Sequence, residues 1–108
     1  MDVTDFQIVT PNVKVGDKLT FSFSLKNKNA SAKTIRLEYA IFYRLANGTL
    51  SKKVFKISEK EYPENSEVRV VKNQSFRIIT TRVFYPGTHE VSVILNGEEF
   101  ARGVFELE

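Results

Sequence analysis

The chain has 108 residues, a formal net charge of +3, 42% hydrophobic residues and 27% charged residues. These values are typical of one globular domain and argue against intrinsic disorder. Its lack of an apolar run of about 18 residues argues against a membrane-spanning helix. Its lack of cysteine excludes disulfides and thiolate chemistry. The start, Met1–Asp5, has no apolar core of a secretory signal. We therefore expect a cytoplasmic location or a domain excised from a longer chain.

The charge is unevenly distributed along the chain. Residues 33–89 carry eleven basic and five acidic residues, a balance of +6, whereas residues 90–108 carry five acidic residues and one arginine, a balance of −4. A basic centre beside an acidic end indicates either an anionic partner or strands that pair side by side in a sheet.

The first predicted strands are residues 3–10 and 18–26, separated by a break at Pro11-Asn12 and a Gly16-Asp17 step. The second strand alternates strictly. One face carries Leu19, Phe21, Phe23 and Leu25, and the other carries Thr20, Ser22 and Ser24. A period of two with one apolar face predicts a half-buried antiparallel strand.

A longer strand is predicted over residues 34–46, because its apolar residues also recur with a period of two. Asn47-Gly48 then predicts a two-residue type I′ hairpin turn. The returning strand, residues 49–57, carries Lys52, Lys53 and Lys56 around two apolar residues. Lysines of this kind protect edge strands from unwanted pairing, so we expect this strand at a sheet edge.

Residues 58–66 are polar and contain Pro63, so they are interpreted as a loop that crosses to a second sheet. Residues 67–74 form the next predicted strand, with Val68 and Val70 directed inward. Residues 89–95 and 98–107 form the last two, joined by a hairpin turn at Asn96-Gly97.

About seven strands with frequent turn signals predict an all-β antiparallel sandwich of two sheets, of the immunoglobulin or fibronectin type, as a single domain over residues 1–108. An OB-type barrel of similar length is the alternative. That fold usually has a helix before its fourth strand, and residues 58–66 are too short and interrupted by proline to form one.

The segment 75–89 fits neither a strand nor a hairpin turn. It combines two arginines, three aromatic residues, a Thr80-Thr81 pair and the turn Tyr85-Pro86-Gly87, and it ends at the single histidine, His89. Long loops on a rigid sandwich often carry binding residues. A docking surface for another protein is therefore one interpretation, and a sheet edge that accepts a partner's strand is a related one.

Catalytic and metal-binding patterns are not evident. A nucleophilic triad needs a base beside serine, and His89 is interpreted as a packed or hydrogen-bonded residue next to a turn. The chain lacks clusters of metal ligands at suitable spacing and lacks the clustered glycines of a phosphate-binding loop. We expect no enzyme activity, no cofactor and no metal.

Nucleic-acid binding is a further hypothesis, because basic and aromatic residues alternate in and around this segment. Six basic residues are available for phosphates and three aromatic residues for bases: Arg44, Lys52, Lys53, Lys72, Arg77 and Arg82, with Phe76, Phe84 and Tyr85. In the competing interpretation, Phe76, Ile78 and Phe84 fill the end of the sandwich while the arginines are solvated or paired.

The block Ser-Phe-Arg-Ile-Ile-Thr-Thr-Arg at 75–82, the Tyr-Pro-Gly-Thr-His at 85–89, the Asn96-Gly97 turn and the closing Phe-Glu-Leu at 105–107 resemble a bacterial C-terminal domain. It is the immunoglobulin-like module that follows the HEAT-repeat domain in some DNA alkylation repair proteins. The resemblance spans roughly residues 18–107, and its specific part is 75–89. The chain departs from that pattern at Ile78, where proline is expected, and at Val83, where arginine is common.

The resemblance implies a non-catalytic accessory domain with a HEAT-repeat domain, another protein or DNA as its partner. It implies no glycosylase activity, because the HEAT-repeat body is absent from this sequence. The candidate binding residues are Lys72, Phe76, Arg77, Thr80, Thr81, Arg82, Tyr85 and His89.

Overall fold

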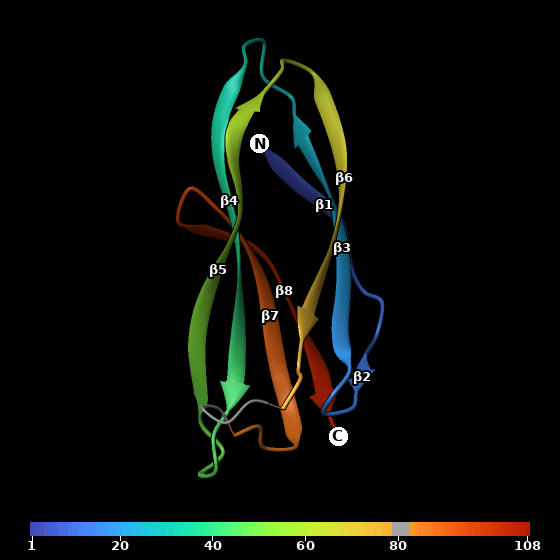
Figure 1. Ribbon diagram of the computed structural model, residues 1–108. Helices are drawn as coiled ribbons and strands as arrows, with labels where there is room; N and C mark the ends of the chain where they lie inside the picture. Colours follow the sequence, from blue (N-terminus) through green and yellow to red (C-terminus); the bar gives the residue numbers. More distant parts are fainter. Residues whose placement is uncertain (79–82) are drawn as a thin grey trace.

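The computed structural model describes residues 1–78 and 83–108, and this part of the chain forms eight strands in two sheets, without a helix (Figure 1). The strands are β1 (Asp2–Ile8), β2 (Asn12–Val13), β3 (Lys18–Asn27), β4 (Lys33–Arg44), β5 (Leu50–Tyr62), β6 (Ser66–Ser75), β7 (Gly87–Leu95) and β8 (Glu98–Leu107). One sheet has the order β1-β3-β6 and the other the order β2-β8-β7-β4-β5. The predicted all-β sandwich is confirmed. The unpredicted element is β2, which pairs in parallel with β8.

The inner faces of the two sheets form the core. The alternation predicted for β3 is confirmed, because Leu19, Phe21, Phe23 and Leu25 are at most 1% exposed. Two serines on the outer face of β3 are also buried, which the alternation did not predict. The guanidinium of Arg69 on β6 covers them, donating hydrogen bonds to Ser22 Oγ at 2.8 Å and Ser24 Oγ at 3.2 Å.

The predicted loop over residues 58–66 is wrong in its first half, because β5 continues to Tyr62. A register shift between Leu37 and Glu38 on β4 lets β5 keep pairing as far as Lys33 with Tyr62. Such a bulge increases the local twist of a strand pair. The strand lies at the edge of its sheet, as predicted, and most of its side chains are exposed. Exposure on both faces removes the alternation that would have revealed the strand.

The two Asn-Gly turns differ. At Asn96-Gly97 both residues have positive φ, 48° and 83°, as a type I′ turn requires, so this hairpin turn is confirmed. At Asn47-Gly48 only Gly48 has positive φ, and the Gly48 N–H donates to the Leu45 carbonyl. The five residues 45–49 therefore form a longer loop between β4 and β5, and the predicted type I′ turn is wrong. The Asn47 side chain instead accepts hydrogen bonds from Thr49, which stabilises the longer loop.

The sandwich is elongated, with extents of 47 × 22 × 21 Å. Figure 1 shows the turns after β3 and β5 at its upper end, and the end of β6, the start of β7 and the C-terminus at its lower end. The lower end therefore carries the described parts of the segment that the sequence singled out, residues 75–78 and 83–89.

Candidate functional site

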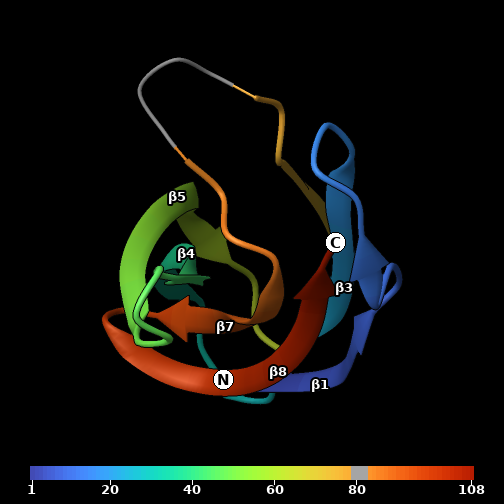
Figure 2. The ribbon, with the colours of Figure 1, turned by 90° about the horizontal axis from the view of Figure 1, so that it is seen from below.

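The segment between β6 and β7 is described at residues 76–78, which follow the three-stranded sheet, and at residues 83–86, which lead into the five-stranded sheet (Figure 2). Its first residues are fixed to the turn before β3. The Phe76 N–H donates to the Asp17 carbonyl at 2.8 Å, and the Gly16 N–H donates to the Phe76 carbonyl at 2.9 Å. The Arg77 N–H donates to Ser75 Oγ at 3.1 Å. The backbone around Arg77 is therefore held by three hydrogen bonds.

An aromatic cluster closes this end of the core. The ring of Phe76 is fully buried and lies 5.2 Å from Phe84, 5.7 Å from Phe105 and 6.0 Å from Tyr43, measured between ring centroids. Such edge and tilted contacts contribute beyond burial alone. Phe76 is therefore a core residue and presents no ring to a ligand.

His89 belongs to the same cluster. It is fully buried, and its Nδ1 lies 3.1 Å from the Gly87 carbonyl oxygen. Burial lowers the pKa of His89 below its usual value, and Arg44 lowers the pKa further, against the opposing effects of Gly87 and Glu106. A neutral imidazole whose Nδ1 donates to Gly87 fits this environment. His89 is therefore a core residue that packs beneath the segment.

The remaining candidate residues differ in position. Arg77 and Tyr85 are exposed, and Lys72 on β6 is half-buried. Three of the predicted residues, Thr80, Thr81 and Arg82, lie outside the described residues. The structure therefore brings Arg77 and Tyr85 to the surface of the lower end and places Phe76 and His89 beneath them.

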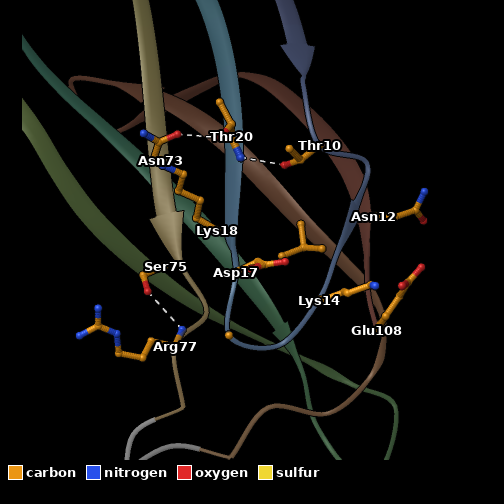
Figure 3. Close-up of a pocket in the computed structure, with 12 residues that line it drawn as sticks. Thr10, Asn12, Lys14, Asp17, Lys18, Thr20, Asn73, Ser75, Arg77 and Glu108 are labelled. Carbon is orange, nitrogen blue, oxygen red and sulfur yellow. Dashed lines mark hydrogen bonds between the residues drawn. The ribbon is translucent and has the colours of Figure 1, made fainter.

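A shallow pocket of about 770 Å³ lies beside the start of β3 (Figure 3). Its charged lining residues are Lys14, Asp17, Lys18, Arg77 and Glu108. The two carboxyl groups offset part of the positive charge of the three basic residues. In Figure 3 the Arg77 side chain points away from the other labelled residues. The pocket is thus of mixed charge, with Arg77 at its border.

A second cleft, of about 420 Å³, lies on the other side of Arg77, between the edge strands β5 and β6. Its lining residues are Tyr43, Lys53, Phe55, Gln74, Ser75, Arg77 and Phe84. Among the described residues, this lining contains two cations, three aromatic rings and no carboxyl group. We call it the β5–β6 cleft. Sequence reasoning missed Gln74, and it grouped Lys53 with Lys52, both as edge lysines and as possible phosphate ligands.

The register of β5 places the neighbouring Lys52 and Lys53 on opposite faces of the sheet. Lys53 pairs with Ile41 on the inner face, and its Nζ lies 5.3 Å from the Phe55 ring centroid. Lys52 pairs with Phe42 on the outer face, and its Nζ lies 5.9 Å from that ring. The period of two along β5 was the signal that could have assigned Lys53 to the cleft.

Within the described ranges, ion pairs engage Lys26, Lys28, Arg36, Lys56 and Arg102 but neither Lys53 nor Arg77. The same residues contain no group of three or more potential metal ligands. No helix among them could cross a membrane. What the lower end offers is a cationic and aromatic surface suited to an anionic ligand that carries a ring.

Comparison with known proteins gives this arrangement a context. The sequence model of the family described as "Uncharacterised protein YhaZ, C-terminal Ig-like domain" matches residues 2–108. A Bacillus subtilis (strain 168) protein called YhaZ is 40% identical over 86 residues, covering 80% of this chain and 24% of that protein. The immunoglobulin-like character predicted from the sequence is therefore confirmed.

Two solved structures show the same fold. The alkylpurine DNA glycosylase AlkC of Pseudomonas fluorescens, bound to DNA containing an abasic site analog, superposes with a TM-score of 0.94 at 28% identity. The match covers 99% of this chain and 30% of that protein. A Listeria innocua β-glucosidase superposes with a TM-score of 0.78 at 16% identity, covering 98% of this chain and 16% of the enzyme, which shows similarity of fold alone. The chain spans less than a third of each of these relatives.

Proposed function

Since this chain belongs to the family of YhaZ C-terminal Ig-like domains, we propose that it is a non-catalytic accessory domain of a DNA alkylation repair-type protein. In this proposal the domain binds DNA through the lower end of the sandwich, with Arg77 and its basic neighbours on the phosphate backbone. Its place of action is the bacterial cytoplasm, and any catalytic groups belong to the remainder of the longer protein.

One observation carries the proposal. Arg77 lines both the shallow pocket and the β5–β6 cleft, and it forms no ion pair with another described residue. Its backbone is anchored to Ser75 Oγ, so its position is defined although its side chain is exposed. An unpaired guanidinium on an anchored backbone is well suited to bind a phosphate.

Similarity to AlkC supports the choice of DNA as the partner, because that protein was solved bound to DNA. A net charge of +3 provides only modest attraction. The domain would therefore add a few phosphate contacts to those made by the rest of a larger protein.

A salt titration of duplex DNA binding tests the proposal. Arg77→Ala should weaken binding and reduce the slope of log K against log salt by about 0.9, the effect of one lost phosphate contact. Lys60→Ala is the matched control, since Lys60 is an exposed cation near the upper end, 5.4 Å from the Tyr62 ring centroid. Equal effects of the two substitutions, or no binding at low salt, would contradict a DNA-binding lower end.

A second candidate is docking against the HEAT-repeat domain or another part of the longer protein. The observation that favours it is the exposure of apolar side chains in the same segment, 73% for Ile78 and 70% for Val83. In a full-length relative, Ile78→Asp with Val83→Asp should then release the domain and accelerate proteolysis between domains. An unchanged cleavage rate would contradict docking through this segment.

A further inference from the structure

We propose that the β5–β6 cleft binds an unpaired nucleotide of a DNA strand, with its phosphate at Lys53 and Arg77 and its ring against Phe84. This inference rests on the proposed DNA-binding function and assigns a ligand class to one part of that surface.

The cleft is a product of the topology. β5 ends the five-stranded sheet and β6 ends the three-stranded sheet, so the two consecutive strands do not pair with each other. Lys53 and Phe55 of β5 and Gln74 and Ser75 of β6 line the cleft between them. On the inner face of β6, Gln74 is held by a hydrogen bond from the hydroxyl group of Tyr39. The opening is therefore bordered by defined side chains, and its volume of about 420 Å³ lies in the range of small-ligand sites.

The charge of the cleft favours an anion. Lys53 enters from β5 and Arg77 from beyond the end of β6, and the part of the lining that the structure describes contains no carboxyl group. The shallow pocket next to it is larger but contains Asp17 and Glu108, which would repel a phosphate. Of the two cavities, the smaller one is thus the better anion site. The ammonium group of Lys53 also lies over the Phe55 ring, at a distance that permits a cation–π contact.

The aromatic walls provide surfaces for a ring. Phe55 is stacked on Tyr39 at 5.1 Å with an interplanar angle of 14°, and Phe84 lies 5.2 Å from Phe76. Phe55 and Phe84 are only partly buried, so each is supported by a core residue and retains exposed surface. Tyr39 and the Lys53 ammonium group already occupy the faces of Phe55, so Phe84 provides the ring surface for a base, and stacking on it does not depend on base identity.

A base inside a duplex is stacked between its neighbours and cannot enter such a cleft without leaving the helix. The proposal therefore predicts preference for single-stranded DNA over a duplex of equal length. It also predicts that inorganic phosphate binds more weakly than a nucleotide, because phosphate uses the cations but not the rings.

The test uses the neighbouring lysines of β5. Lys53→Gln and Lys52→Gln remove the same charge from the same edge strand, but only Lys53 lines the cleft. Binding of a fluorescent oligothymidine of about ten nucleotides is measured by anisotropy for both variants and for Phe84→Leu. We expect Lys53→Gln and Phe84→Leu to weaken binding about fivefold or more, and Lys52→Gln about twofold or less. Near-UV circular dichroism checks that Phe84→Leu keeps the native fold.

Each outcome is decisive. Equal losses for Lys52→Gln and Lys53→Gln, or equal affinity for duplex and single strand, would overturn the cleft site while leaving the proposed DNA-binding function intact. Competition by inorganic phosphate as strong as by thymidine monophosphate would reduce the site to an anion site and overturn the nucleotide assignment. Absence of binding to both DNA probes would overturn the proposed function together with this inference.

Discussion

Phe76 and Asp17 are joined through the backbone, with the Phe76 N–H donating to the Asp17 carbonyl at 2.8 Å. This bond links the end of β6 to the turn before β3, where the chain leaves the three-stranded sheet. It places the Phe76 ring in the core and turns Arg77 to the surface. The backbone at the start of the candidate site is thus held in place by this hydrogen bond.

Loss of the Phe76 ring should therefore be costly. We expect Phe76→Ala to lower the free energy of unfolding by about 3–5 kcal/mol, through lost burial and the cavity left behind. Ile78→Ala is the control, because Ile78 is 73% exposed and should change stability by about 0.5 kcal/mol or less. Chemical denaturation measures both. A loss below about 1 kcal/mol for Phe76→Ala would show that this ring does not close the core.

The buried His89 should make stability depend on pH. Burial and Arg44 lower its pKa in the folded state, whereas the unfolded chain takes up the proton near the usual value of 6.5. Because the unfolded state then binds more protons, stability should fall as the pH drops below about 6.5, until it reaches the lowered folded pKa. Denaturation curves for wild type and His89→Phe at several pH values test this. The His89→Phe variant should lose that part of the pH dependence, and identical slopes would contradict the assignment.

Gly103 on β8 is required by the close approach of β1. A Cβ atom at this position would lie 2.8 Å from Ile8 Cδ1 and 2.9 Å from Phe6 Cε2. Gly103→Ala should lower the free energy of unfolding by about 1–3 kcal/mol through overpacking. Ile8→Val removes the nearer atom, so the double variant should be more stable than the sum of the single changes predicts. If the changes in the free energy of unfolding add strictly in a double-mutant cycle, the contact with Ile8 does not cause the loss of stability.

Asn27 stabilises the opposite end of the sandwich. It is 1% exposed, and its Nδ2 donates to the carbonyl oxygens of Tyr62 and Pro63 at 3.1 Å and 3.0 Å. Asn27→Ala should cost about 1–3 kcal/mol in stability, because those acceptors lose their donor. DNA affinity of the folded variant should stay unchanged, since Asn27 ends β3 at the upper end of the sandwich, whereas Arg77 follows the end of β6 at the lower end (Figure 1). A parallel loss of affinity in anisotropy measurements would place the binding surface elsewhere.

Alternation made the central strands predictable from the sequence. Because β3 and β4 each bury one face, their apolar residues recur with a period of two. The turn at Asn96-Gly97 was predictable because both residues tolerate positive φ. The second half of β5 was not, because Ser58, Glu59 and Lys60 lie at an edge and bear no apolar pattern.

The site was predictable in part. The sequence identified Arg77 and Tyr85, which are exposed at the lower end. It could not distinguish Phe76 as a core residue, because its burial follows from hydrogen bonds to Gly16 and Asp17, about sixty residues earlier in the chain. The β5–β6 cleft could not be predicted from the sequence either, since it depends on the two strands belonging to different sheets.

The most direct test of the central claim is a map of amide chemical shifts during titration of the ¹⁵N-labelled domain with DNA. We predict that the shifts concentrate at the lower end, at Lys53, Gln74 and Arg77, and leave Asn27 and Asn65 near the upper turns unchanged. Shifts centred on the upper turns, or on the outer face of the five-stranded sheet around Lys52, would contradict binding through the lower end.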